Sequence, residues 1–281
     1  MNVNIRPMMK SDFGFALDLS GQEYWGYDLV DLERLFQLFP EGCLIAEYEG
    51  ARAGWVVVST YGRLAWIGSL VVRGNLRGRG IGAALLDHAV RYSRGVGVKT
   101  VGLYSYSESV GFYMRRGFKR DCDFEHVEGR VEKISPRGSV QQPSDLDEAI
   151  EFDAKCFRGN RRLLLEALHK EFPDLFISRK QARVFGYIAG KNFSDDTAEI
   201  GPWVCDITCI EAAEQLFASE LDQLPSRTIS LTIPSGNLEA HRIVKKYGFH
   251  VKQRVTRMFD GNAEDLPRID AIYAAAGLDV G

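Results

Sequence analysis

The stretch VRGNLRGRGIGA, residues 72 to 83, joins an apolar run to a segment with helical periodicity, and it holds four glycines and three arginines. Glycines let a backbone turn tightly and approach a ligand closely, because they carry no Cβ. A turn that leads from a strand into a helix presents unpaired N–H groups at the positive end of the helix dipole. With arginine side chains beside them, these donors predict a site that binds a pyrophosphate.

Two common nucleotide-binding loops fit this stretch poorly. A dinucleotide-binding fingerprint needs its glycines directly after the strand and an acidic residue about 20 positions further on. Here Gly80 and Gly82 come several residues after Val72, and residues 100–106 contain no carboxylate. A Walker loop is excluded as well, because no Lys-Ser or Lys-Thr pair closes the turn.

The composition is that of a globular protein with two domains. The chain has 281 residues, of which 45% are hydrophobic and 26% charged, and this length favours two units of roughly 130 to 140 residues. The net charge of −3 gives no general attraction to nucleic acid or anionic lipid, so phosphate binding has to be local. A small-molecule or peptide substrate is therefore expected, with no nucleic-acid or membrane partner.

The ends of the chain and its cysteines indicate a cytoplasmic protein. The first residues, MNVNIRPMMKSD, contain no apolar signal core, and no apolar run approaches the length of about 20 residues that crosses a bilayer. The cysteines lack the paired spacing of a zinc site, so we expect no metal. They are Cys43, Cys122, Cys156, Cys205 and Cys209.

The same succession of elements is predicted twice, which is typical of a duplicated domain. Residues 130–145, with Pro136, Gly138 and Pro143, predict a linker. On each side, a Ser-Asp helix cap comes early, and a helix closed by Gly-Phe and followed by a strand comes late. The fold class is therefore predicted as α+β, a mixed sheet flanked by helices, with domains at 1–130 and 131–281.

Between these landmarks, apolar runs separated by glycine turns predict antiparallel strands in each half. The first half has expected strands at 42–50, 51–60 and 64–72, a helix at about 80–92 and a strand at 100–106. The second half has expected strands at 182–190 and 198–206, a helix at about 210–221 and a strand at 228–234. Both halves thus end in the order strand, helix, strand, helix, strand.

With the turn, the segment FYMRRGF at residues 112–118 makes the first half resemble the GNAT acyltransferase superfamily. The family's Arg/Gln-x-x-Gly-x-Gly/Ala pattern is matched by Arg77, Gly80 and Gly82. The resemblance implies that the turn holds the pyrophosphate of acetyl-coenzyme A (acetyl-CoA), that the preceding strand pairs with its pantetheine arm, and that Tyr113 protonates the departing thiolate. The implied cofactor-binding residues are Leu70, Val71, Val72, Arg77, Gly78, Arg79, Gly80, Ile81, Gly82 and Tyr106, where Tyr106 replaces an asparagine that the family often has.

The second half resembles the degenerate carboxy-terminal domain of tandem GNAT proteins. It carries an Ile-Gly-Pro-Trp segment at 200–203 but no glycine-rich turn, and its acidic residues at the corresponding place would repel phosphates. Asn237 matches the family's asparagine, whereas Ile243 and Val244 replace the aromatic pair. This half is therefore expected to bind no cofactor.

The general base is the least determined part of the site, because the strand at 64–72 holds no carboxylate or histidine. Glu23 is the candidate base, and Trp25 and Tyr27 are candidates for the walls of an amine site through cation–π contact. A solvated glutamate and ordinary core aromatics explain the same residues equally well.

Together these features predict transfer of an acetyl group from acetyl-CoA to a primary amine of a small molecule or peptide, by direct attack in a ternary complex. A non-catalytic acyl-CoA sensor or assembly module is the alternative, and a different acyl donor is a third possibility. A homodimer is compatible with the sequence. The acceptor is not determined by these residues.

Overall fold

The computed structural model describes residues 3–132, 140–141, 146–172, 175–180, 183–192, 196–224 and 227–281, with the backbone alone for 141 and 175–180. Most of the predicted linker and the predicted Ser144-Asp145 cap lie outside these residues. Elsewhere the predicted elements are present. The strands at 100–106 and 228–234 begin and end as expected, while the helix predicted at 80–92 extends to residue 95.

The first half forms a sheet with the strand order β1-β2-β3-β4-β5. Neighbours β2–β3 and β3–β4 are antiparallel hairpins, as predicted, and β4 and β5 run parallel. The strands are β1 (Val3–Pro7), β2 (Cys43–Tyr48), β3 (Ala51–Tyr61), β4 (Leu64–Val72) and β5 (Thr100–Tyr106). The helices are α1 (Phe13–Gln22), α2 (Leu29–Leu38), α3 (Ile81–Gly95) and α4 (Val110–Met114), with short 3-10 turns at Lys10–Asp12, Gly74–Leu76 and Ser107–Ser109.

The second half forms a similar sheet with the order β11-β10-β9-β8-β7, in which β13 pairs with β10 from outside this path. Its strands are β7 (Val140–Gln141), β8 (Leu175–Lys180), β9 (Arg183–Asn192), β10 (Thr197–Cys205), β11 (Thr228–Pro234) and β13 (Ile272–Ala274). Its helices are α5 (Asp147–Phe157), α6 (Arg162–Glu171), α7 (Ile210–Gln223) and α8 (Leu238–Lys246), and a 3-10 turn spans Ala263–Asp265.

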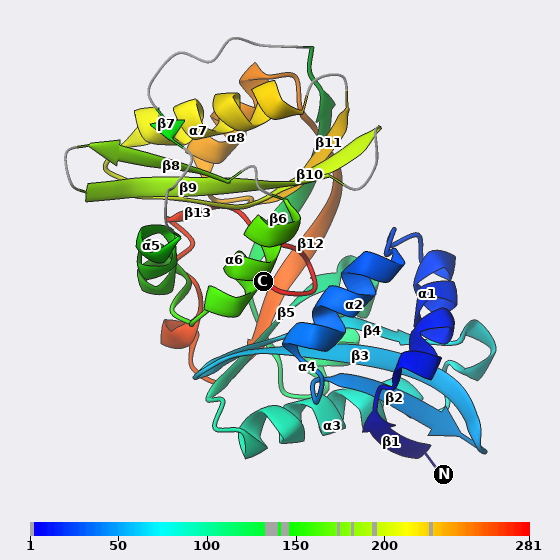
Figure 1. Ribbon diagram of the computed structural model, residues 1–281. Helices are drawn as coiled ribbons and strands as arrows, with labels where there is room; N and C mark the ends of the chain where they lie inside the picture. Colours follow the sequence, from blue (N-terminus) through cyan, green and yellow to red (C-terminus); the bar gives the residue numbers. More distant parts are fainter. Residues whose placement is uncertain are drawn as a thin grey trace.

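The two halves exchange their last long strands, β6 (Lys119–Arg130) and β12 (His250–Asp260). β6 leaves the first half to pair with β11, and β12 returns to pair with β5. The exchanged strands also pair with each other, so the order β5-β12-β6-β11 joins both sheets into one. In Figure 1 the two strands pass between the upper and lower parts of the molecule. Strand pairing thus connects the two halves from β5 through β12 and β6 to β11.

Helices cover both faces of each half (Figure 1). In the first half, α3 and α4 bury one apolar face around Leu85 and Leu103, and α1 and α2 cover the other around Trp55. That second core also takes in Phe157, Leu164 and other residues from the second half. Burial of apolar surface therefore stabilises the contact between the halves as well as each sheet.

The Gly-Phe pairs end their helices as predicted. Gly117 has φ 90° and follows α4, and Gly248 has φ 83° and follows α8. Both values lie in the left-handed region, which glycine adopts without a steric penalty.

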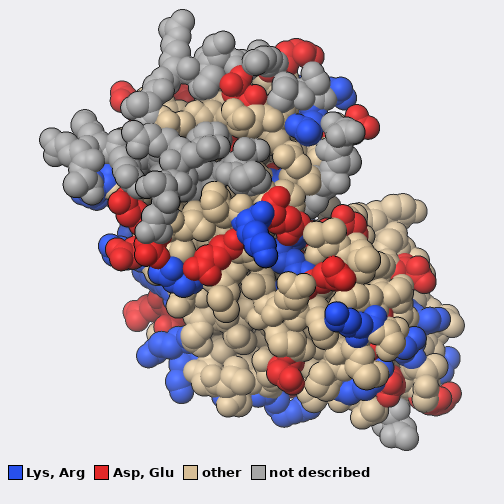
Figure 2. All heavy atoms as spheres, viewed as in Figure 1, with Lys and Arg blue, Asp and Glu red and all other residues tan. Residues whose placement is uncertain are grey.

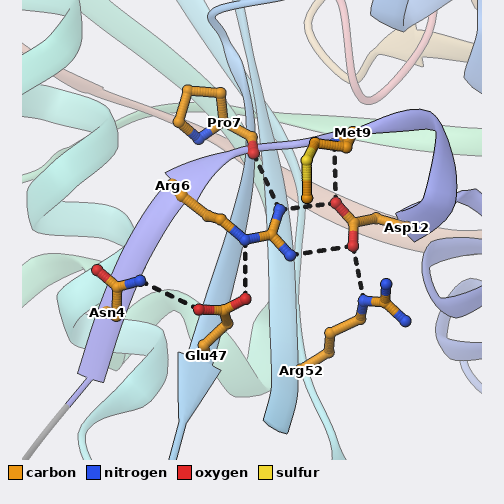
Figure 3. Close-up of polar contacts among 7 residues, drawn as sticks. All are labelled: Asn4, Arg6, Pro7, Met9, Asp12, Glu47 and Arg52. Carbon is orange, nitrogen blue, oxygen red and sulfur yellow. Dashed lines mark hydrogen bonds and ion pairs between the residues drawn. The ribbon is translucent and has the colours of Figure 1, made fainter. Parts of the chain in front are cut away.

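The predicted Ser-Asp cap before α1 is wrong. The buried Asp12 carboxylate makes no side-chain capping bond to α1. It instead accepts hydrogen bonds from Arg6 (Nη1 to Oδ2, 2.7 Å), from Arg52 (Nε to Oδ1, 2.6 Å) and from the Met9 N–H (2.8 Å), as Figure 3 shows. Burial opposes the carboxylate charge, but these hydrogen bonds outweigh it and lower the pKa of Asp12 to about 2. Asp12 thus fastens β1 and β3 to the start of α1.

A second buried ion pair links α5 to the segment before α6. The Arg161 guanidinium donates to both oxygens of Asp153, at 3.1 and 2.6 Å, and each side chain is 1% exposed. Tyr187 Oη also donates to Asp153, at 2.7 Å. Its burial identifies this pair as structural.

On the face of the molecule in Figure 2, acidic and basic side chains are interspersed. Neither sign gathers into a large patch on this face. This distribution fits the small net charge of −3.

Candidate active site

The turn between β4 and α3 is built around glycines with left-handed backbones. Gly78 has φ 77° and Gly80 has φ 76°, and Gly80 immediately precedes α3. Among the described residues, no acceptor lies within hydrogen-bond range of the backbone N–H groups of residues 78–83. These donors lie at the amino end of a helix of 15 residues, where the helix dipole adds positive potential. Together they form a site suited to an anion.

Arg77 and Arg79, two of the three arginines in this turn, point in different directions. Arg77 Nε donates to the Val72 carbonyl oxygen at 3.0 Å, and its Nη2 pairs with Glu23 Oε1. The Arg79 guanidinium lies 5.8 Å from the centroid of the Tyr48 ring. Because the Arg77 side chain is 53% exposed, its pair with Glu23 contributes roughly 0 to 1 kcal/mol. An anionic ligand can therefore compete with Glu23 for Arg77.

β4 and β5 separate just before the turn. They pair in parallel from Leu64 and Thr100 to Ile67 and Leu103, and beyond that point β5 pairs with β12 on its other side. At the same place the register of β4 with β3 shifts, and Ser69 takes φ 53°. Such a bulge bends the strand and re-aims its peptide groups. The separation leaves an edge of β4 beside which an extended ligand can lie.

The turn and the separated strands form one wall of a cleft of about 1510 Å³. The far wall comes from the second half and from the exchanged strands, and includes Lys191, Glu199 and Gln253. All the predicted site residues except Arg79 line this cleft: Glu23, Trp25, Tyr27, Leu70, Val71, Val72, Arg77, Gly78, Gly80, Ile81, Gly82, Tyr106 and Tyr113. Residues that are far apart in the chain, from Glu23 to Tyr113, thus line one cleft.

Tyr113 lies in α4 with its ring between two other aromatic rings. Its centroid is 5.1 Å from that of Phe112 and 5.9 Å from that of Phe118. Burial raises the pKa of Tyr113 to about 12, so the hydroxyl keeps its proton at neutral pH. Among the described residues this hydroxyl forms no hydrogen bond, and Tyr113 is one of the residues that line the cleft.

The sequence reasoning missed the part of the cleft contributed by the last residues of the chain. Tyr27 Oη donates to Asp279 Oδ2 at 2.6 Å and lies 2.8 Å from Ser69 Oγ. Burial, together with the nearby Asp279 carboxylate, raises the pKa of Tyr27 well above its usual value. No motif surrounds Asp279 in the sequence, and the strand exchange that brings the second half over β4 could not be read from residue order.

The corresponding groove of the second half is filled by its own chain. β10 and β11 pair in parallel at residues 197–199 and 228–230. Beyond that, β13 pairs with β10, and the Ala275 N–H donates to the Thr232 carbonyl oxygen at 3.0 Å. A Cβ on Gly201 would lie 2.0 Å from the Ala275 carbonyl oxygen, so the chain passes against the strand there. Asn237 caps α8 through Ala240 N–H and donates to the Ile272 carbonyl oxygen.

The described residues contain no group of three or more His, Cys, Asp or Glu side chains arranged to hold a metal ion. No helix in the described ranges combines the length and the hydrophobicity that crossing a membrane requires.

Comparison with known proteins finds the same family in both halves. The family model described as "Acetyltransferase (GNAT) family" matches residues 10–118, and the model described as "Acetyltransferase (GNAT) domain" matches residues 149–274. An uncharacterized N-acetyltransferase from Methanocaldococcus jannaschii is 28% identical over 135 residues. These residues are 41% of this chain and 60% of that protein.

Two solved structures resemble nearly the whole chain. A candidate acetyltransferase from Pyrococcus horikoshii has a TM-score of 0.83 at 21% identity, over 99% of this chain and 96% of that one. A tandem GNAT protein from the clavulanic acid biosynthesis pathway has a TM-score of 0.64 at 15% identity, over 92% of this chain and 98% of that one. At these identities the likenesses establish the fold.

Proposed function

The chain belongs to the acetyltransferase (GNAT) family and has two tandem GNAT domains. We propose that it is an N-acetyltransferase whose first domain acetylates a primary amine of a small molecule or peptide with acetyl-CoA. One observation carries the proposal. The N–H groups of residues 78–83, without acceptors in the described part of the chain, adjoin the gap between β4 and β5. The anion site at the turn is thus continuous with a groove between β4 and β5, in which an extended ligand can lie.

The residues present fit acetyl-CoA. The N–H groups of the turn would hold the pyrophosphate, with Arg77 at the edge of the cleft as an additional donor. The β4 edge at Leu70, Val71 and Val72 would hold the pantetheine arm through its peptide groups. When bound, acetyl-CoA supplies the acetyl group as a thioester and leaves as the thiol.

We assign Tyr113 as the acid of the reaction. Its hydroxyl is protonated at neutral pH, as expected for a tyrosine with an ordinary pKa of about 10, and burial raises this pKa further, to about 12. A thiolate that develops nearby would take this proton, and general acid catalysis of this kind typically contributes 10²- to 10⁴-fold in rate. The free hydroxyl and the aromatic neighbours that orient the ring support this role.

Trp25 and Tyr27 are assigned to the acceptor side of the cleft. They come from the segment between α1 and α2, and the Tyr27 hydroxyl reaches Ser69 at the β4 bulge. Glu23, the base expected from sequence, pairs with Arg77. Since this pair faces the phosphate end of the cleft, Glu23 fits a role in holding Arg77 better than one in deprotonating the amine.

We also propose that the second domain binds no coenzyme A. β13 and Ala275 occupy the place between β10 and β11 that corresponds to the open gap in the first domain. Near the start of α7, Asp206 pairs with Arg183, and within the helix Glu214 pairs with Lys246 and Arg242. Although these carboxylates are compensated by cations, Glu211 in the first turn of α7 adds a negative charge at the helix start and makes it a poor anion site.

Release of free thiol from acetyl-CoA tests the proposed activity. Turnover is measured with a panel of primary amines and amino-terminal peptides, with water as the control acceptor. We expect thiol release that depends on at least one amine and yields its acetylated product. Tight binding of acetyl-CoA with no amine-dependent release across the panel would instead favour a sensor of acyl-CoA.

A further inference from the structure

The last residues of the chain form a fixed arm that runs from the second domain to the acceptor side of the first. The arm begins at β13, which is paired with β10. It ends where the Tyr61 hydroxyl donates to the Val280 carbonyl oxygen at 2.9 Å and Arg161 donates to that of Gly281 at 2.6 Å. The arm is thus held at its start by strand pairing with β10 and at its end by hydrogen bonds from the buried side chains of Tyr61 and Arg161.

Between these ends the arm lies directly on the β4 bulge. A Cβ on Gly68 would be 2.3 Å from the Asp279 Cα, so only glycine lets the arm lie this close to β4. Here the Asp279 carboxylate accepts the hydrogen bond from Tyr27, whose hydroxyl also meets Ser69. Ser69 is three residues before Val72, or roughly 10 Å along an extended strand. The carboxylate therefore lies near the inner end of the proposed pantetheine groove.

Asp279 differs from the other carboxylates that line the cleft. Glu23 pairs with Arg77, Asp31 with Arg34, and Glu199 with Lys191. Glu128 lies within ion-pair distance of Lys252, and Glu108 is exposed to solvent. In the described part of the chain the partly buried Asp279 forms no ion pair of its own. Lys191 Nζ, which pairs with Glu199, lies nearby, since a Cβ on Gly277 would be 2.7 Å from Asp279 Oδ1 and 3.8 Å from Lys191 Nζ. A carboxylate in this state attracts a cationic ligand, because an ion pair compensates the cost of removing its charge from water.

We propose that Asp279 binds the ammonium group of the acceptor, so that the second domain completes the active site of the first. This inference rests on the proposed acetyltransferase function and adds the residue that selects a protonated primary amine. Tyr27 fixes the carboxylate by its hydrogen bond, and Trp25 lines the same cleft. The second domain then has a function in the reaction although its own groove is filled.

Binding of ammonium probes without acetyl-CoA tests this assignment separately from the acetyl transfer. The probes are butylammonium, benzylammonium, 1,5-diaminopentane and glycinamide, each compared with a neutral alcohol of similar shape. Tryptophan fluorescence reports binding, because Trp25 lines the cleft and Trp55 lies 5.9 Å from the Tyr27 ring. We expect saturable binding of at least one ammonium probe and much weaker binding of its alcohol.

Three variants separate charge from structure. Asp279→Asn keeps the shape and can still accept the Tyr27 hydrogen bond, and we expect at least 30-fold weaker ammonium binding. Tyr27→Phe keeps the charge and loses the hydrogen bond, and Asp279→Glu keeps the charge on a longer side chain. For both we expect a loss of less than tenfold. Melting temperatures within a few degrees of wild type exclude a folding defect.

Equal binding by wild type and Asp279→Asn would overturn the assignment, as would the absence of charge-dependent binding by every probe. A larger loss with Tyr27→Phe than with Asp279→Asn would identify Asp279 as an anchor of the arm only. Ammonium binding without thiol release would leave this assignment standing and refute the proposed function. If Asp279→Asn released thiol at the wild-type rate, the assignment of Asp279 would be refuted and the proposed function would stand.

Discussion

At the scale of single residues, the phenol of Tyr113 carries the clearest chemical prediction. Replacing Tyr113 with Phe removes the proton donor but keeps the ring contacts with Phe112 and Phe118. We expect kcat to fall by about 10²- to 10⁴-fold, with the Kd for acetyl-CoA within twofold of wild type. Tyr24→Phe, at a tyrosine that lines the same cleft, is the matched control, for which steady-state rates should change by less than threefold. Equal losses in the two variants would contradict the role of Tyr113.

Asp12 provides a prediction about stability and pH. The pKa of Asp12 is about 2 in the folded protein and about 4 in the unfolded chain. The charged carboxylate therefore stabilises the fold in full above about pH 4. This stabilisation is lost as the pH falls from about 4 to 2. Asp12→Asn should cost about 2 kcal/mol at pH 7, measured by urea unfolding. Exposed Asp18→Asn should cost less than about 0.5 kcal/mol.

The difference between Asp12→Asn and wild type should narrow in unfolding measurements taken towards pH 2, because wild-type Asp12 is then protonated as well. A difference that stays constant from pH 7 to pH 2 would show that its charge does not stabilise the fold.

At the scale of elements, the ion pair between Asp153 and Arg161 holds α5 to the start of α6. Asp153→Ala leaves a buried guanidinium without its carboxylate, and we expect a loss of roughly 3 to 5 kcal/mol in the free energy of unfolding. Asp147 on the same helix pairs with Arg162 at the surface, where both side chains are more than 40% exposed. Asp147→Ala should therefore cost less than about 1 kcal/mol, and comparable losses in chemical denaturation would contradict the account.

Elements whose pattern is local were predictable from the sequence. β5 and β11 are short apolar runs between turn residues, and Gly117 and Gly248 mark where helices end. The cap expected at Asp12 failed because two distant arginines, Arg6 and Arg52, use the carboxylate instead. Local patterns show that a polar side chain will have partners but not which partners these are.

At the scale of the whole molecule, the strand exchange decides which residues meet in the cleft. β6 and β12 could each have closed the sheet of its own half, since either arrangement satisfies the same backbone hydrogen bonds. The order of residues in the sequence does not distinguish these two strand pairings. Because the position of the last residues depends on which pairing forms, that position could not be predicted either. The glycine-rich turn and Tyr113 could be predicted because they lie in the same half of the chain. Asp279 could not be predicted as part of the site because its position depends on how the two halves are joined.

The central claim is that the N–H groups around Gly80 bind the pyrophosphate of acetyl-CoA, and calorimetric titration tests it most directly. A Cβ on Gly82 would face Val72, Leu70 and Phe112 at 3.6 to 3.9 Å, so alanine fits there and a larger side chain enters the cleft. We predict one site per chain, less than tenfold weaker binding for Gly82→Ala, and at least 100-fold weaker binding for Gly82→Leu. Wild-type affinity in Gly82→Leu, or no binding by wild type, would contradict the account.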